Sequence, residues 1–230
     1  MAPSVTLAGL VLADARFPGG GHTHSGGVEE AVARRLVTGV DDLAAFLHGR
    51  LRTTGLTAAA FAAAAVADAG AAEPRWAALD SEFDARTPSV AQRDASRAQG
   101  RATLRAARAA WPSPVLDALA TVHPRPHHAL LAGAVVGISG GQPVEAAQCV
   151  AYLAVSGPAS AAIRLLGLDP FAVNAVVVGL APILDEVVVV AVDAARSTPA
   201  GLPAPGAPML DLLAQSHVRH HREQVRLFAS

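Results

Sequence analysis

The sequence predicts an all-α protein: a single-domain, irregular bundle of about ten helices joined by short loops. Three observations support this fold class. Of the 230 residues, 52% are hydrophobic but only 4% are aromatic, a composition that favours closely packed helices over an aromatic-filled β-sandwich. Apolar residues recur at the three- and four-residue steps of a helix. No segment shows the convincing two-residue alternation of a half-buried strand.

The expected helices lie, in chain order, at residues 5–13, 28–36, 40–53, 56–69, 73–85, 88–111, 115–122, 127–138, 143–167, 170–194 and 208–228. The first is an apolar run that no basic residue precedes, which favours a short buried helix over a signal peptide. The second begins with Glu29 and Glu30, whose carboxylates suit the positive end of a helix dipole, and Ser25 is placed to cap it.

Prolines mark further helix boundaries and one expected interruption. Thr87-Pro88 and Asp169-Pro170 each place a capping side chain before a proline at the first helical position, where the missing N–H costs nothing. Pro158 lies inside an expected helix, where proline removes a backbone donor. We therefore expect a kink or a break at Pro158.

The apolar stretch 170–194 raises the question of a membrane span. Val173, Val177 and the apolar residues that follow step by four and three, as on one face of a helix. An aspartate at a bilayer centre costs about 2.5 to 3.5 kcal/mol, whereas each apolar residue returns only about 0.3 to 0.6 kcal/mol. Because the run contains Asp185 and Glu186, we interpret it as a buried amphipathic helix and expect no membrane partner.

The C-terminal region is expected to be an arm on an extended linker. Residues 197–208, STPAGLPAPGAP, contain four prolines and show no apolar periodicity. The chain then divides into a helical bundle at 1–196, a Pro/Gly-rich linker at 197–208 and a partner-binding helical arm at 209–230. We expect the linker to leave the arm mobile until a partner orders it.

The composition excludes several chemistries. The chain has no lysine, so it cannot by itself form a Walker-type phosphate loop or a Schiff base. A net charge of −1 gives no general attraction to nucleic acid or to an anionic membrane. The single cysteine, Cys149, can form neither an intrachain disulfide nor a thiolate metal cage, which fits a reducing cytoplasm.

The segment 17–30, FPGGGHTHSGGVEE, is the strongest candidate for a functional loop. His22 and His24 lack a third ligand of obvious spacing, which disfavours a preformed metal site. Ser25 resembles the serine of a nucleophile turn, but that turn needs a parallel sheet. A serine hydrolase using Ser25 and a free-standing nickel-binding protein using the loop and arm histidines stay open as alternatives. Otherwise the glycines shape a turn for a partner, through positive φ or close approach.

A stripe of arginines follows the expected start of the helix at 88–111. Its members recur at steps of four, four, four and three: Arg93, Arg97, Arg101, Arg105 and Arg108. They lie on one helix face, about a third of the circumference wide. The simplest interpretation of such a face is a solvated surface. The functional interpretation is a docking surface for an acidic partner. Because the face carries no stacking aromatics, no nucleic acid partner is expected.

Four stretches, in chain order, carry a resemblance to a known family. They are Phe17-Pro18, Gly20, His24-Ser25, Gly27 and Glu29; then Ser96, Gly100 and Arg101; then Pro126-His127 and residues 161–165, AAIRL; and finally the arm with His217 and Arg226-Leu227-Phe228. On these stretches, which span nearly the whole chain, the sequence resembles the urease accessory protein UreF family, in an actinobacterial-like branch. The sequence departs from the family pattern at Gly21, His22 and Gly26, where small polar, phenylalanine and aromatic residues are frequent, and at Gly157-Pro158, which replaces a more regular helical sequence.

The resemblance implies a non-enzymatic, cytoplasmic, dimeric chaperone that supports nickel insertion into apo-urease. Proteins of this family bind the partner called UreD or UreH, and the pair recruits the GTPase UreG. Nickel and GTP would then be handled by UreG, so no stably bound cofactor, catalytic residue or metal ligand is expected in this chain. The partner-binding residues that the resemblance implies are Pro18, Gly20, His24, Ser25, Gly27, Glu29, Arg97, Arg101, His217, Arg219, Arg226 and Phe228.

Overall fold

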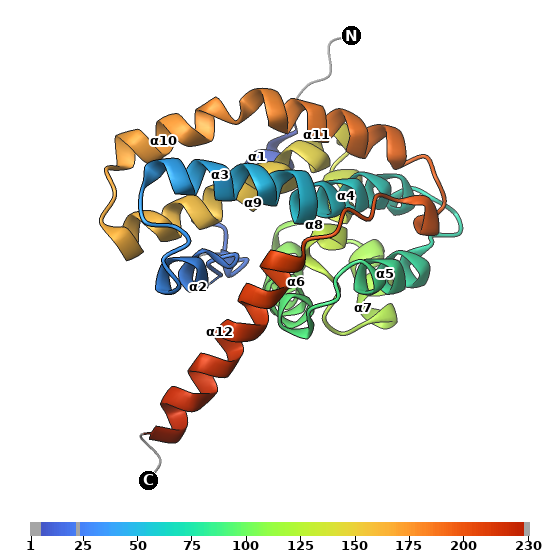
Figure 1. Ribbon diagram of the computed structural model, residues 1–230. Coiled ribbons are helices and arrows are strands. Elements are labelled where there is room, and N and C mark those ends of the chain that lie inside the picture. The colour runs from blue at the N-terminus through green and yellow to red at the C-terminus, as the bar shows by residue number, and fades with distance from the viewer. Residues whose placement is uncertain (1–5, 22–23, 228–230) are drawn as a thin grey trace.

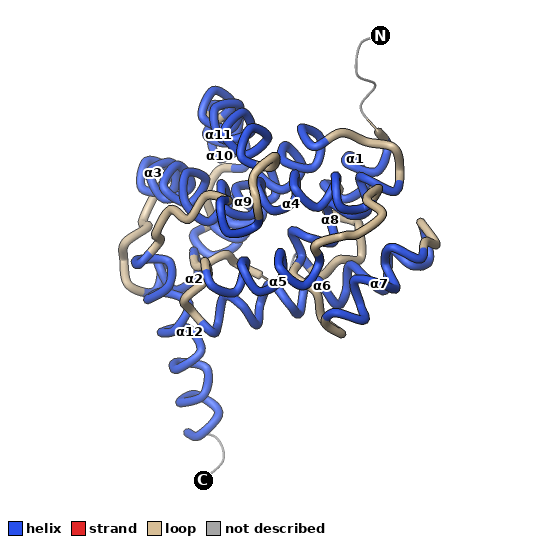
Figure 2. Tube along the Cα trace, turned by 90° about the vertical axis from the view of Figure 1, so that its right-hand side faces the viewer, coloured by secondary structure: helices blue, strands red, loops and turns tan. Residues whose placement is uncertain are grey.

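The computed structural model confirms the all-α prediction (Figure 1). It describes residues 6–21 and 24–227, with side chains up to residue 218, and these ranges contain helices and loops but no strand (Figure 2). In chain order the elements are α1 Leu7–Ala13, α2 Val28–Ala33, α3 Val40–Arg50, η2 Leu51–Gly55, α4 Leu56–Ala69, α5 Trp76–Ala85, α6 Val90–Ala110, α7 Pro114–Val122, α8 His128–Ile138, α9 Pro143–Leu166, α10 Pro170–Gly179, α11 Ala181–Ala194, η3 Pro199–Gly201 and α12 Pro208–Leu227.

Three helices, α4, α8 and α9, form the centre of the bundle. α4 packs along both α8 and α9, and α11 covers α4 and α9 from outside. α5, α6 and α7 lie on the other side of this centre, where α6 and α7 contact α8 and α5 contacts α4. α12 begins beside α2 and α6 and then projects away from the body (Figure 1). The base of the arm therefore lies next to the helix that follows the Gly-rich loop.

Small residues let the central helices touch backbone to backbone. Residues 59–65 of α4, AAFAAAA, are all buried. A Cβ atom placed on Gly133 of α8 would lie 2.1 Å from the carbonyl oxygen of Ala62. Gly137, one turn later, approaches the carbonyl oxygen of Val66 in the same way, at 2.9 Å. This contact confirms the closely packed helices that the composition predicted.

Two expected helix boundaries are different in the structure. α3, the π-helical segment η2 and α4 form one continuous helical run over residues 40–69, where the sequence predicted two helices. Conversely, the single helix expected at 170–194 is two helices, α10 and α11, which bend by 43° where they meet. The cause of the bend is Pro182 in the first turn of α11, since it cannot donate a hydrogen bond back to the preceding turn.

The capping residues were predicted correctly for α10 and wrongly for α6. The Asp169 carboxylate accepts the backbone N–H of Phe171 at 3.0 Å, and Pro170 occupies the first helical position, as expected. The expected cap at Thr87-Pro88 is wrong, because Ser89 caps α6 and the helix begins after it. A serine directly after the proline was the signal that the sequence analysis missed.

α9 continues through Pro158 from Pro143 to Leu166, so the expected break is absent. Proline removes the N–H that would bond to the carbonyl oxygen of Ala154. That oxygen instead accepts the Nε–H of Arg50, the last residue of α3, at 2.9 Å. A side chain from another helix thus replaces the donor that the proline lacks.

The linker runs along the body and is not a free spacer. Arg86, just after α5, donates to the carbonyl oxygens of Ala200 at 2.7 Å and Leu202 at 3.2 Å, and the Leu202 side chain is buried. In the arm itself, Leu210 and Leu213 are also buried. The expectation of an arm that is mobile from its base is therefore wrong for the first two turns of α12, which are packed onto the bundle.

By length and composition alone, α9 could cross a membrane, and α10 with α11 would count as a second span if taken as one broken helix. The core helix of a protein that does not cross a membrane passes the same test. In this bundle α9 contacts α1, α2, α3, α4, α8, α10 and α11. The apolar character of α9 is accounted for by its place among these helices.

Candidate partner-binding surface

The Gly-rich loop between α1 and α2 crosses the outside of α6. Phe17 packs against Trp111 at the end of α6, with ring centroids 6.3 Å apart. A Cβ atom on Gly19 would lie 2.9 Å from the hydroxyl of Thr103, and Gly20 has a φ of +73°. The predicted need for glycine, through close approach or positive φ, is confirmed at these two positions.

The loop ends in a glycine cap and not in a serine cap. Gly27 is the N-cap of α2, with a φ of +95°. Ser25 contributes only its backbone carbonyl, which accepts the N–H of Val28 at 3.2 Å, so the expected side-chain cap is wrong. Glu29 and Glu30 do occupy the first turn of α2, where the helix dipole favours carboxylates.

The base of the arm packs onto this loop. A Cβ atom on Gly27 would lie 3.8 Å from Leu210 and 4.0 Å from Leu213 of α12. Further along α12, Nε2 of His217 lies 4.0 Å from the carboxylate of Glu29. Segments from opposite ends of the chain, the loop with α2 and the base of α12, therefore form one continuous surface, which we call the loop–arm surface.

A cavity of about 650 Å³ lies beneath the loop–arm surface. Its walls come from the loop, the linker and the helical elements α2, α3, η2, α4, α5, α6, α8, α9 and α12. The side chains that give it polar character include His24, Ser25, Glu29, Arg50, His128 and His217. Four of the predicted residues, His24, Ser25, Glu29 and His217, are thus brought together, and Gly27 also lines the cavity.

Burial sets the charge state of one histidine in this cavity. Burial, with a smaller contribution from the neighbouring His24, lowers the pKa of His128 to about 4. His128 is therefore a neutral imidazole at physiological pH. Neither histidine belongs to a cluster of three metal-type ligands among the described residues. The geometry thus gives the nickel-binding alternative no support here, and His22 lies outside the described residues.

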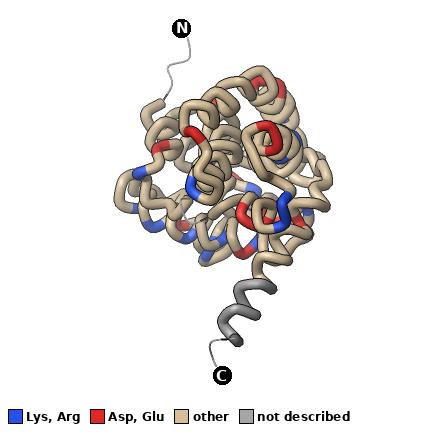
Figure 3. Tube along the Cα trace, turned by 60° about the vertical axis from the view of Figure 1, so that its left-hand side comes forward, with Lys and Arg blue, Asp and Glu red and all other residues tan. Residues whose placement is uncertain are grey.

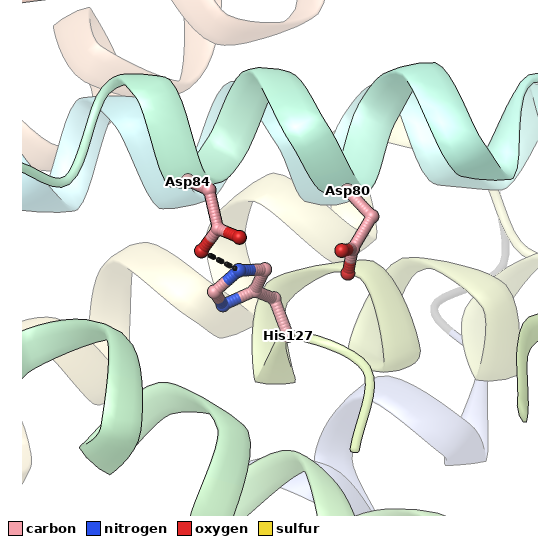
Figure 4. A group of neighbouring side chains, drawn as sticks. All are labelled: Asp80, Asp84 and His127. Atoms are coloured by element: carbon pink, nitrogen blue, oxygen red, sulfur yellow. Dashed lines mark hydrogen bonds and ion pairs between the residues drawn. The ribbon is translucent and has the colours of Figure 1, made fainter. Parts of the chain in front are cut away.

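Arg97 belongs to a buried ion network between α5, α6 and the start of α8. Its guanidinium donates to the carboxylates of Asp80, at 2.9 and 3.1 Å, and Asp84, at 2.7 Å. Nε2 of His127 lies 2.9 Å from Asp84 (Figure 4), and its Nδ1 lies 3.0 Å from the hydroxyl of Ser96. Burial lowers the pKa of His127 to about 4, so the neutral ring donates to Asp84 and accepts from Ser96.

Asp80, Asp84 and His127 are also the described side chains whose ligand atoms lie close enough together to hold a metal ion, within 4.8 Å of one another. However, the Arg97 guanidinium already lies 2.9 and 2.7 Å from the two carboxylates and supplies the positive charge. A metal ion would have to displace a buried cation together with its hydrogen bonds, which is costly. We therefore interpret this group as a structural ion network.

The network gives a structural role to the two motifs that contain Ser96 with Gly100 and Pro126 with His127. The hydroxyl of Ser96 bonds to His127, as described above, and one turn later Gly100 of α6 contacts Pro126. A Cβ atom on Gly100 would lie 1.8 Å from the carbonyl oxygen of Pro126, so only glycine allows this contact. The two motifs are the two halves of the contact between α6 and α8.

The arginine stripe on α6 is divided between the interior and the surface. Arg101, Arg105 and Arg108 are exposed, but Arg97 is only 6% exposed. The interpretation of the stripe as one exposed basic face is therefore wrong at Arg97, whose charge is neutralised inside the bundle. In the view of Figure 3, residues of both signs are interspersed over the body.

The remaining predicted residues are placed as follows. Pro18 is exposed in the loop. Arg219 and Arg226 lie on the projecting part of α12, of which only the backbone is described, and Phe228 lies outside the described residues. The hydroxyl of Ser25 makes no hydrogen bond to a described histidine, and the described chain offers no sheet beneath it, so the hydrolase alternative gains no support.

Among the polar cavity residues named above, sequence reasoning missed Arg50 and His128. Arg50 had a detectable signal, since a proline inside a helix leaves a carbonyl that needs another donor. No local pattern shows which donor reaches it, because Arg50 and Ala154 are distant in sequence. His128 lies in a helix that was predicted correctly, but no sequence pattern marked it as a residue of the cavity.

Comparison with known proteins identifies relatives over almost the whole chain. The sequence pattern of the UreF family matches residues 37–181. The chain is 48% identical to the urease accessory protein UreF of Mycobacterium sp. (strain JLS), and the match covers 96% of this chain and 97% of the relative. It is 46% identical to the protein of the same name from Mycolicibacterium vanbaalenii and 44% identical to that from Mycobacterium tuberculosis, with the same coverage.

Proposed function

The chain belongs to the UreF family of urease accessory proteins, and on that premise we propose that it is a non-enzymatic adaptor in the insertion of nickel into apo-urease. In this role it binds the partner called UreD or UreH, and the pair then recruits the GTPase UreG. Nickel and GTP are handled by UreG, and the assembly acts on apo-urease in the cytoplasm. This chain contributes surfaces and no bound cofactor.

The observation that supports this proposal is the convergence of the loop and the arm. His24, Ser25, Gly27 and Glu29 come from the N-terminal loop and α2, and His217 comes from the C-terminal arm, yet all line one cavity. The lining of the cavity includes His217 and Val218 of α12. The base of α12 also exposes Met209 and Leu212, which offer further contact area that a second protein can bury.

Truncation of the arm tests the proposal. Removing residues 215–230 keeps Leu210 and Leu213, which pack the base of α12 onto the bundle, but removes His217 and the projecting helix. We expect this variant to keep its helical circular dichroism and its melting temperature while losing co-purification with the UreD or UreH partner. Capture of the partner at undiminished affinity by the truncated protein would show that the arm is not the docking element.

The same proposal includes a homodimer, for which α10 and α11 offer the most suitable face. Val173, Val187 and Ala191 are buried against the bundle, as the sequence predicted. Phe171, Val178 and Val189 are 86%, 63% and 60% exposed. α10 contains no charged residue, so a second copy of the same face meets no repulsion there. An exposed apolar surface of this kind marks an interaction site.

A further inference from the structure

Arg50 makes two hydrogen bonds that join distant parts of the chain. Its Nε–H donates to the carbonyl oxygen of Ala154 in α9 at 2.9 Å, the oxygen left without a helical partner by Pro158. Its Nη1–H donates to the carbonyl oxygen of Gly26 in the Gly-rich loop at 2.8 Å. A single guanidinium therefore ties the loop to the central helix of the bundle.

Gly26 and Pro158 fit each other at the same place. Gly26 has a φ of +62°, and a Cβ atom on it would lie 2.8 Å from Cγ of Pro158 and 3.0 Å from Cζ of Arg50. The proline thus has two effects: it frees the carbonyl that binds Arg50, and its ring fills the space that the glycine leaves open.

The charge of Arg50 is held by backbone oxygens alone. Among the described residues no carboxylate pairs with Arg50, and its hydrogen bonds go to the two carbonyl oxygens. Burial lowers the pKa of Arg50 to about 10, so the side chain is still charged at physiological pH. Hydrogen bonds from a charged donor in a partly buried site are stronger and more directional than those from a neutral donor.

We propose that Arg50 is a positioning residue that fixes the loop at Gly26 and thereby places the N-cap and first turn of α2 against the arm. Gly27 follows Gly26 directly, and its backbone carbonyl accepts the N–H of Ala31 at 3.1 Å. Glu29, in the same turn, faces His217 of the arm. The effect on partner binding rests on the proposed function, whereas the effect on the loop does not.

Amide hydrogen exchange on the full-length chain tests the proposal without a partner. The reporters are the amides of Val28 and Ala31, which bond to the carbonyl oxygens of Ser25 and Gly27. In Arg50→Met we expect both to exchange about tenfold faster or more, which corresponds to losing one hydrogen bond from a charged group. Amides of α8 should be unchanged, which shows that the bundle is intact.

Arg52→Met is the matched control. Arg52 lies two positions after Arg50 in the chain, but its guanidinium pairs at 2.6 Å with the exposed Glu186 instead of with the loop. It should leave the Val28 and Ala31 amides unchanged. Unchanged exchange in Arg50→Met, or an equal increase in Arg52→Met, would overturn the proposal. If Arg50→Met fails to fold, Arg50→Lys replaces it, since lysine keeps the charge but cannot reach both oxygens with one planar group.

Pro158→Ala provides an independent test. Alanine restores the N–H that bonds to Ala154 within α9, so the oxygen no longer depends on Arg50. We expect the melting temperature to stay equal or rise, while the Val28 and Ala31 amides exchange faster. A variant in which melting temperature and both amides are unchanged would contradict the proposed coupling.

Partner capture is then measured separately with the same variants. Arg50→Met should capture the UreD or UreH partner more weakly than wild type, and Arg52→Met should equal wild type. If wild type itself captures no partner, the proposed function fails while the exchange result still decides the role of Arg50. If Arg50→Met loosens the loop but captures the partner as well as wild type, the link from the loop to binding is overturned.

Discussion

At the scale of single residues, the structure explains the sequence through a few close contacts. Gly100 is required because α6 touches the backbone at Pro126, and Ser96 is required because it satisfies the buried ring of His127. The sequence showed these residues as a motif, but it could not show that they contact one another. The reason is that each contact joins residues about thirty positions apart, which no local pattern specifies.

Gly100→Ala tests the contact between α6 and α8. The added methyl group would lie 1.8 Å from the carbonyl oxygen of Pro126, so the helices must move apart. We expect a loss of about 3 kcal/mol or more in the free energy of unfolding, measured by urea denaturation.

The control for that variant is Gly49→Ala, inside α3 and not next to a proline. Outside its own stretch of helix, no described atom lies within 4 Å of a Cβ atom built on Gly49. Alanine should therefore raise the free energy of unfolding by about 0.5 to 1 kcal/mol through its better helix propensity. Equal effects of the two substitutions would show that the close approach at Gly100 is not what requires glycine there.

Two histidines, the buried His127 and the partly buried His128, make stability depend on pH. Burial holds the pKa values of His127 and His128 at about 4, below their ordinary value of 6.5, so folding favours the neutral form. The unfolded chain then binds more protons between these values, and stability is lost as the pH falls from 6.5 towards 4. We expect the free energy of unfolding to be lower at pH 5 than at pH 7.5.

The replacement His127→Gln separates the contribution of one ring. Glutamine can still donate to Asp84 but does not titrate, so the decrease in stability between pH 7.5 and pH 5 should become smaller. An unchanged decrease would mean that His127 is not protonated on unfolding in this range.

At the scale of helices, starts and apolar faces could be predicted, whereas interruptions could not. Asp169 and Pro170 gave the start of α10 correctly because a cap is a local interaction. The continuity of α9 through Pro158 depends on Arg50, and the position of the linker depends on Arg86, so both required the tertiary structure. Pro182 could have predicted the junction of α10 and α11. The apolar periodicity continues across this position, however, so a single helix was predicted.

The apolar face of α10 and α11 carries a prediction about oligomeric state. Val189→Glu should convert the proposed dimer into a monomer, because two copies would bring buried negative charges together. Leu7→Glu is the matched control, since Leu7 of α1 is 73% exposed, is also apolar, and lies on a different helix. Sedimentation velocity distinguishes these outcomes. A Val189→Glu protein that sediments like wild type would exclude this face as the interface.

At the scale of the whole molecule, the bundle brings the two ends of the chain together. The composition predicted closely packed helices, but not that α4, α8 and α9 form the centre. The sequence also identified the loop and the arm as candidate sites, but only the fold shows that Gly27 meets Leu210 and Leu213. The predicted sites therefore form one surface, whereas Arg97 belongs to the interior and Arg101 to a separate exposed face of α6.

The most direct test of the loop–arm surface is an amide hydrogen-exchange footprint of the full-length chain with and without the purified UreD or UreH protein proposed as its partner. We predict that binding protects residues 24–29 and residues 214–218 together, while α10 and α11 keep the exchange of the partner-free chain. Protection confined to α10 and α11, or protection of the arm with no change in the loop, would contradict a single surface built from both ends of the chain.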